Sequence, residues 1–233
     1  MDVKTTLYAL ADLLMVFAGF TYGWKFIRNY RNYLLGLEWI IVASSGTNFL
    51  VYGLIGADET SPMFHLAFFL DAFSRSVGIT LILVLGLMKV THRFTPSIAV
   101  DVGVFGLAIV GGLVMSFFAA DLGLAGAIFY VAVNALTTVF LLYFAWRLWR
   151  IDAHGTAITV AAVTIAAAAI AGTYDFYRIP GDDAHHTIFY ILALTTWASQ
   201  MIAYYHGYRV LHESNERTGA RRVMVDKVSN RVR

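Results

Sequence analysis

Cysteine is absent from this chain of 233 residues, and charged residues make up only 14% of it. The lack of cysteine excludes disulfide bonds, thiolate metal sites, haem attachment through cysteine and cysteine nucleophiles. A soluble domain carries about 25% charged and about 45–50% apolar residues, whereas 59% of this chain is hydrophobic. With a mean hydropathy of +0.66, the composition is that of a protein surrounded largely by lipid.

Long apolar runs account for this composition. A bilayer core about 30 Å thick is crossed by roughly 20 mostly apolar helical residues, and seven segments meet this requirement. They lie at about 6–27, 33–56, 63–90, 97–119, 123–149, 156–177 and 186–208. These segments predict an all-α polytopic membrane protein. Because the connections are short, residues 1–208 are expected to form one seven-transmembrane-helix bundle. Residues 209–233 are expected to form a basic, disordered tail.

The distribution of positive charge predicts how the bundle sits in the membrane. Apart from Lys4, Arg75 and Arg178, every lysine and arginine falls at the first, third or fifth connection or in the tail. Because these residues concentrate on the cytoplasmic side, we predict an N-terminus outside and a cytoplasmic C-terminus, a parity that seven spans satisfy. The short connections and the lack of other targeting signals favour a multi-pass protein of the cell membrane, in a bacterial inner membrane.

Asp71 and Arg75 are ionisable residues inside the third segment, in the sequence "FFLDAFSRSVGIT". Residues four apart lie on one face of a helix, and both are too far from the segment ends to reach the membrane surface. Ionisable groups at this depth are costly and need a partner, a water-filled cavity or a function. The pair is therefore either an ion pair that holds the bundle in register or a proton- or ion-linked site.

Further polar residues fall at comparable depth in other segments. If their faces turn inward, they form a polar cavity open to the outside, with the Asp71–Arg75 pair at its floor. The candidate ligand-binding or proton-linked residues are then Asp71, Arg75, Asp12, Asn48, Asn134 and Gln200.

Three features receive structural interpretations. The pattern "GFTYG" at Gly19–Gly23 allows two helix backbones to approach closely. Glu38 and Asp101 lie near cytoplasmic helix ends, where Arg28, Arg31 and Arg93 are expected to pair with them. Aromatic residues close to the end of the seventh segment are typical of a belt at the membrane interface: Tyr204, Tyr205, His206 and Tyr208.

The stretch "TYDFYRIPGDDAHH" joins the sixth and seventh segments. Pro180 and Gly181 predict a turn, and Asp182 or Asp183 is suited to cap the helix that follows. The same stretch supplies a candidate outer gate, since a histidine can change charge near physiological pH. The predicted gate residues are Asp175, Arg178 and His186.

A metal site is only weakly indicated. Nitrogen and oxygen ligands are available from Asp182, Asp183, His185, His186 and His65. However, adjacent histidines on a helix point about 100° apart, and the sequence lacks the HxxxH and HExxH spacings that place two imidazoles on one face. We therefore assign no metal and expect no cofactor.

In length, helix number and orientation the chain resembles the microbial rhodopsins, which bind retinal through a lysine of the seventh helix. Here the lysines are Lys4, Lys25, Lys89 and Lys227, and the seventh segment reads "ILALTTWASQMIAYY". A retinal Schiff base is therefore excluded, and the resemblance is architectural. Asp71 also lies where the ceramidase and adiponectin-receptor superfamily has a zinc-site aspartate, but the accompanying histidines are absent, so one residue makes no match.

Transport is the leading functional hypothesis. A small solute or ion would pass, in a proton-linked manner, through the cavity around Asp71 and Arg75. One alternative is a membrane-embedded enzyme acting on a lipid-like substrate, which the sequence favours less. Another is a non-catalytic sensor or assembly subunit that uses the basic tail.

The expected partners follow from the surface charges. The lipid bilayer surrounds the bundle, and the basic tail suits anionic lipid headgroups or an acidic partner. Nothing in the sequence indicates nucleic-acid binding, and the oligomeric state is left open.

Overall fold

The computed structural model describes residues 3–55, 60–183 and 186–231. Within these ranges every regular element is a helix, and no strand is formed. Six helical stretches of the described residues are long and apolar enough to cross a membrane, as expected of a multi-pass membrane protein. They are Val3–Tyr30, Tyr33–Gly53, Pro62–Thr91, Ile98–Phe117, Ala119–Trp149 and His154–Thr173.

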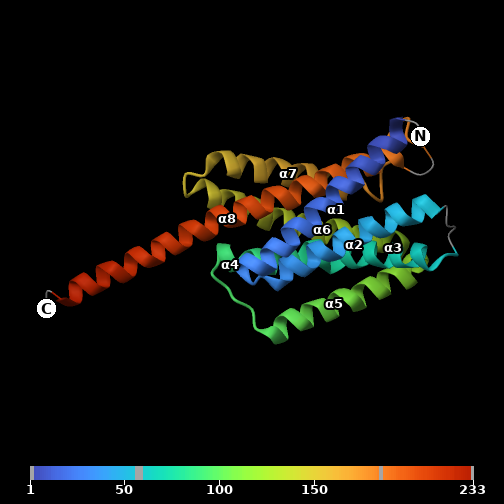
Figure 1. Ribbon diagram of the computed structural model, residues 1–233. Coiled ribbons are helices and arrows are strands. Elements are labelled where there is room, and N and C mark those ends of the chain that lie inside the picture. Colours follow the sequence, from blue (N-terminus) through green and yellow to red (C-terminus); the bar gives the residue numbers. More distant parts are fainter. Residues whose placement is uncertain (1–2, 56–59, 184–185, 232–233) are drawn as a thin grey trace.

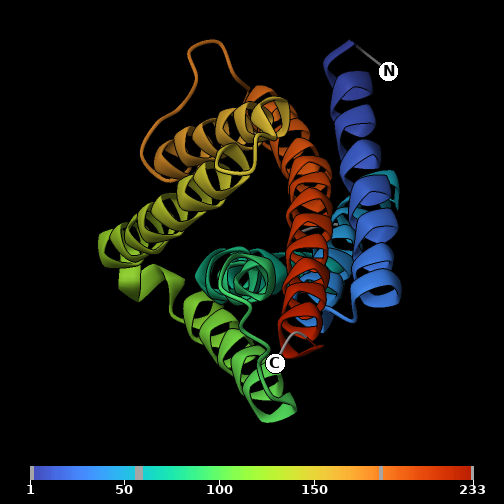
Figure 2. The same cartoon turned by 90° about the vertical axis from the view of Figure 1, so that its left-hand side faces the viewer.

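The helices form one elongated bundle (Figure 1). In chain order they are α1 (Val3–Tyr30), α2 (Tyr33–Ile55), α3 (Pro62–Phe73), the π-helix η1 (Ser74–Ile82), α4 (Leu83–Thr91), α5 (Ile98–Phe117), α6 (Ala119–Trp149), α7 (His154–Thr173) and α8 (Thr187–Arg231). Seen end-on, the rod made of α3, η1 and α4 lies between α5, α6 and α8 (Figure 2). Helix α1 packs against both α2 and α8, which closes the bundle on that side.

Local sequence signals set several helix ends. Ser61 begins α3, where its Oγ accepts a hydrogen bond from the Phe64 amide at 3.2 Å, and Ser97 begins α5 in the same way with Val100. Gly123 has a φ of +42° and breaks α6, so that its long straight part starts at the predicted residue.

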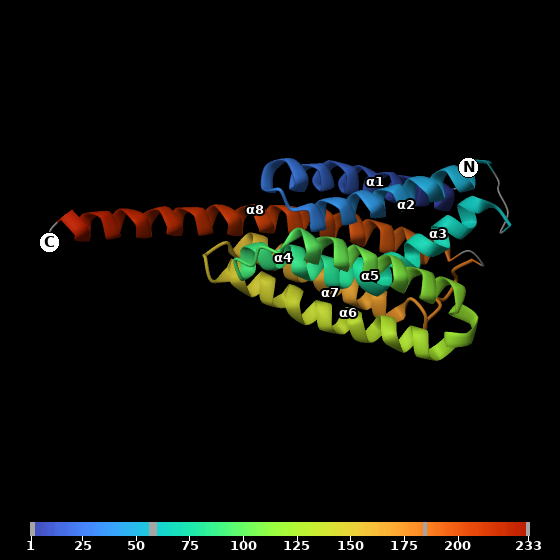
Figure 3. The ribbon, with the colours of Figure 1, turned by 90° about the horizontal axis from the view of Figure 1, so that it is seen from below.

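Helix α8 extends far beyond the other helices (Figures 1 and 3). The sequence analysis predicted a helix ending near residue 208 and a disordered tail, whereas the structure continues the helix to Arg231. Two reasons for this correction are visible in the described part of the tail. Glu213 pairs with Arg209 and Arg217 one turn away on either side, each at 3.8 Å, and Asn215 Nδ2 donates to the Val90 carbonyl of α4 at 2.8 Å.

The end of the bundle opposite the N-terminus is closed by an aromatic core. The Phe26 ring lies 4.8 Å from that of Trp39, 5.2 Å from that of Tyr205 and 5.0 Å from that of Tyr208. These side chains and Tyr204 are buried among neighbouring helices. The prediction that Tyr204, Tyr205 and Tyr208 form an interfacial belt is therefore wrong, because they face the core and not the lipid.

Helices α1 and α2 approach closely at the predicted glycine pattern. A Cβ atom at Gly19 would lie 2.7 Å from both the Ala43 Cβ and the Trp39 carbonyl oxygen, and one at Gly23 would lie 2.8 Å from the Gly36 carbonyl oxygen. Only glycine fits at these two positions without moving backbone.

We expect Gly19→Ala to destabilise the protein by about 1–3 kcal/mol, because the added methyl group overpacks the α1–α2 contact. Unfolding in detergent micelles measures this change. The matched control is Gly103→Ala in α5, where an added Cβ meets nothing within 4 Å. Equal stability of the two variants would contradict close packing of α1 on α2.

Candidate functional site

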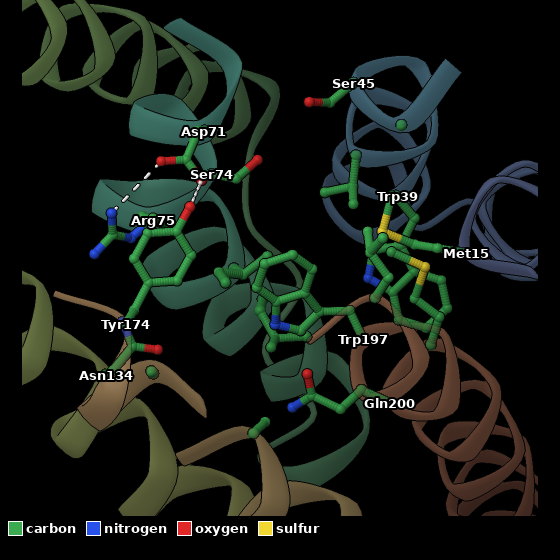
Figure 4. A pocket seen from close by; sticks show the side chains of 18 of the residues that line it. Met15, Trp39, Ser45, Asp71, Ser74, Arg75, Asn134, Tyr174, Trp197 and Gln200 are labelled. Carbon is green, nitrogen blue, oxygen red and sulfur yellow. Dashed lines mark hydrogen bonds and ion pairs between the residues drawn. The ribbon is translucent and has the colours of Figure 1, made fainter. Parts of the chain in front are cut away.

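A cavity of about 130 Å³ lies inside the bundle, and every helix except α5 contributes to its lining. One side carries Asp71, Arg75 and Tyr174, and Trp39, Met15, Trp197 and Gln200 face them across the cavity (Figure 4). Alanines of α7, at 167, 168 and 171, leave the room that the cavity occupies. The site is thus mostly apolar and aromatic, with a few polar groups, as is usual for pockets that bind small molecules.

Five of the six predicted ligand-binding or proton-linked residues line this cavity: Asp12, Asp71, Arg75, Asn134 and Gln200. Asn48 does not. Its Nδ2 donates to the Met63 carbonyl at 2.9 Å and ties α2 to the first turn of α3. The convergence is geometric, and the role of these residues in binding or proton transfer stays a prediction.

Arg75 is the centre of a network at one end of the cavity. Its Nη1 lies 3.5 Å from Asp71 Oδ2, and its Nη2 donates to Asp175 Oδ2. The guanidinium is stacked between two tyrosine rings, 4.0 Å from the centroid of Tyr130 and 3.9 Å from that of Tyr174. The Tyr174 hydroxyl donates to Asp71 Oδ1 at 3.4 Å. The predicted intrahelical pair therefore also joins η1 to α6 and to the connection after α7.

The three predicted gate residues have separate environments. Asp175 pairs with Arg75, whereas Arg178 Nη2 donates to the Asp183 carbonyl at 2.9 Å. His186 is exposed and has a φ of +54°. No contact among the three is seen in the described residues, and only Asp175 reaches the cavity network.

The weak metal candidates do not gather either. His65 is exposed on α3, and His185 lies outside the described residues. Across residues 3–55, 60–183 and 186–231, no group of three or more histidine, aspartate or glutamate side chains is placed to hold a metal ion.

Asp182 and Asp183 cap α8, which confirms that part of the sequence analysis. Asp182 Oδ1 accepts from the Ile188 amide at 2.9 Å and its Oδ2 from the Phe189 amide at 3.0 Å. Asp183 Oδ1 accepts from the Thr187 amide at 3.1 Å. Burial raises the pKa of the Asp182 carboxyl, but the three amide donors at Ile188, Phe189 and Asp183 outweigh it, and the pKa lies below its ordinary value.

Glu38 is a buried carboxyl that sequence reasoning misplaced. Its side chain is 0% exposed, and the hydroxyl of Ser74 on η1 interacts with its carboxyl. It faces η1, where a Cβ atom at Gly78 would lie 2.2 Å from Glu38 Oε1. The expected salt bridge with Arg28, Arg31 or Arg93 is wrong, because depth along a helix does not determine which neighbour a side chain faces.

The same reasoning failed for Asp101. The charge that acts on its carboxyl is that of Lys89, whose ammonium group also donates to the carbonyls of Tyr30 and Arg31 at the end of α1. These carbonyls and Lys89 close the turn between α1 and α2.

The π-helix η1 is the second feature that the sequence did not reveal. It runs for nine residues in the middle of the central rod. Stretches of this kind are rare and are frequently found at functional sites. Here it carries Arg75, Ser74 and Ile79 into the cavity and places Gly78 against Glu38. The sequence gives no signal for the π-helix, whereas the buried carboxyl is signalled by Glu38 itself, a lone acid in the apolar run "YLLGLEWIIV".

A second cavity of about 480 Å³ lies on the other side of the Arg75 network, between α3, α5, α6 and the start of the α7–α8 connection. Asp71 and Arg75 line both cavities. The network therefore forms a partition between them.

Comparison of the chain with protein-family models, with curated proteins and with solved structures finds no match. The functional argument accordingly depends on the geometry described above.

We expect Arg75→Gln to destabilise the protein by about 3 kcal/mol, because it leaves Asp71 and Asp175 without their shared cation. Unfolding in detergent provides the measurement. The control Arg217→Gln, at a side chain that is 83% exposed, should cost about 0–1 kcal/mol. Neutralising both carboxyls in the Arg75→Gln background should restore most of the stability, and failure to do so would show that charge is not the cause.

We expect Asp182→Ala to lower stability by about 1 kcal/mol at pH 7, through loss of the α8 cap. A carboxyl whose pKa is lowered on folding stabilises above its unfolded value of about 3.9, and this contribution disappears as the pH falls through the lower folded value. The difference between wild type and variant should therefore shrink below about pH 4. Glu216→Ala, at an exposed position of α8, serves as control and should show neither effect.

Proposed function

We propose that the chain is a seven-span protein of a bacterial inner membrane that moves a small solute or ion, linked to protons, through its interior cavity. The first half of α8, "TIFYILALTTWASQMIAYY", is the seventh span. The asymmetry of lysine and arginine supports an N-terminus outside and a cytoplasmic tail.

The observation that carries the proposal is the set of carboxyl groups inside the bundle. Asp12 and Asp71 line the cavity, and Glu38 lies buried against η1. Bringing a carboxylate out of water without a partner costs several kcal/mol, yet Asp12 has no hydrogen-bond partner among the described residues. The group that interacts with the Glu38 carboxyl is the neutral Ser74 hydroxyl and not a cation. Ionisable groups at membrane depth typically mark ion pathways and proton relays.

The two ends of the cavity are bordered by different groups, which supports a transport cycle. Toward the predicted cytoplasmic side the lining includes Trp39, whose ring lies 4.8 Å from that of Phe26 in the aromatic core. On the outer side the Arg75 network separates the interior cavity from the second cavity. A path to the outside would open when Asp175 leaves Arg75, and this replaces the three-residue gate of the sequence analysis. The π-helical stretch, which carries both Arg75 and the contact with Glu38, is the element suited to couple the two ends.

Proton flux into liposomes tests the proposal. We expect the reconstituted wild type to acidify or alkalinise a trapped pH dye under an imposed gradient, and Asp71→Asn to lose most of this flux, because the amide cannot exchange a proton. Asp121→Asn, at an exposed carboxyl in the first turn of α6, should retain it.

Equal flux in wild type and Asp71→Asn would remove Asp71 from the pathway. If the folded wild type shows no flux, transport of protons is excluded, and Asp71 and Arg75 are left as a structural ion pair.

A sensor is the second candidate, and the observation that favours it is the continuity of α8. The helix lines the cavity with Trp197 and Gln200 and then continues to Arg231 without a break. Its basic tail would meet anionic lipid headgroups or an acidic partner. A folded wild type without flux would favour this candidate.

A further inference from the structure

We propose that the interior cavity binds a small protonated amine with an apolar body, whose ammonium group pairs with Asp12. This inference deepens the proposed function, since it names the chemical class of the solute. It stands on the charge, hydrogen-bonding and size of the cavity.

The first step is charge. The ionisable acid and base side chains that line the cavity are Asp12, Asp71 and Arg75. Arg75 is already engaged by Asp71 and Asp175 and stacked between two tyrosine rings. Asp12, by contrast, is 0% exposed, and neither oxygen has a hydrogen-bond partner within the described chain. The cavity thus contains a carboxyl group for which the described lining supplies no cation.

The cavity that Asp12 lines also contains aromatic rings, which suit a cation. Tyr8 lies one turn earlier on α1 and interacts electrostatically with Asp12. Trp39 and Trp197 line the same cavity, and their positions opposite the Arg75 network are seen in Figure 4. Faces of tyrosine and tryptophan rings attract cations, tryptophan most strongly. An anion would gain nothing from these rings and would meet Asp12.

Hydrogen-bonding capacity distinguishes a protonated amine from a quaternary ammonium ion. Asn134 Nδ2 donates to the Tyr130 carbonyl at 2.9 Å, and Gln200 Nε2 donates to the Tyr204 hydroxyl at 2.8 Å. Their amide oxygens are left as acceptors. The hydroxyls of Thr137 and Thr138 donate to backbone carbonyls one turn earlier, so their oxygens are also acceptors. These side chains match a ligand that brings N–H donors.

Gly46 supports the same assignment from the side of α2. A Cβ atom there would lie 2.6 Å from Asp12 Oδ1 and 2.6 Å from the Met15 Cε. The glycine lines the cavity and makes room for the carboxyl without contributing a donor of its own. With a volume of about 130 Å³, the cavity takes a ligand of roughly six non-hydrogen atoms, since a cavity of about 150 Å³ holds one benzene molecule.

The test uses three probes of one shape and different charge that match the cavity volume: 3-methylbutylammonium, 3-methylbutan-1-ol and 3-methylbutanoate. Binding to the purified full-length chain in detergent is followed by tryptophan fluorescence, since Trp39 and Trp197 line the cavity, and by calorimetry. We expect 3-methylbutylammonium to bind best. Asp12→Asn should weaken it about 10- to 100-fold, the usual effect of losing a charged hydrogen-bond partner. Asp121→Asn should leave it unchanged.

Binding of 3-methylbutan-1-ol controls for the fold, because a neutral ligand does not need the Asp12 charge. Equal affinity of wild type and Asp12→Asn for the alcohol shows that the cavity is intact in the variant. Tighter binding of 3-methylbutanoate than of 3-methylbutylammonium, or no binding of the amine to the folded wild type, overturns the inference. Amine binding without proton flux would refute the proton pathway alone, and proton flux without amine binding would refute the amine site alone.

Discussion

The Arg75 guanidinium holds together the end of the bundle at which the N-terminus lies. A cation at this depth is tolerated because it has two carboxylate partners, Asp71 and Asp175, and two aromatic faces. Those partners come from α3, from α6 and from the connection between α7 and α8. Satisfying one charge therefore fixes the relative positions of segments that are distant in sequence, and the cavity wall follows from that arrangement.

Glu38 and Asp12 present the opposite case. Each is enclosed completely, yet within the described chain neither is paired with a cation. Asp12 has no hydrogen-bond partner there, and Glu38 interacts with the neutral Ser74 hydroxyl. A protein selected only for stability would replace such groups with apolar residues of similar volume. Their presence beside a π-helical stretch and an internal cavity is best explained by a role that requires a proton or a cation to arrive and leave. The proposed proton pathway and the proposed amine site are two forms of that role.

The sequence predicts those features of the fold that depend on one segment at a time. Apolar run lengths located the helices, Gly123 marked the start of a long helix, and the two aspartates before Thr187 announced a cap. Features that depend on pairs of segments escaped it. Asp175 and Arg75 form an ion pair although they are 100 residues apart in the sequence. Glu38 was expected at the same depth in the membrane as the arginines, but its side chain faces η1 and not them. The sequence likewise does not distinguish a tyrosine that faces lipid from one that packs against a neighbouring helix. Tyr208 was expected to face lipid, but it is buried against its neighbours.

The length of α8 has a mechanical consequence. A helix resists twisting about its own axis. A rotation that a ligand beside Trp197 or Gln200 imposes on α8 would therefore be transmitted to the whole protruding segment. At 1.5 Å per residue, Asn215 lies roughly 22 Å along the rod from Gln200. Its bond to the Val90 carbonyl ties the rod to the end of α4, so a rotation of α8 must either break this bond or carry the end of α4 with it.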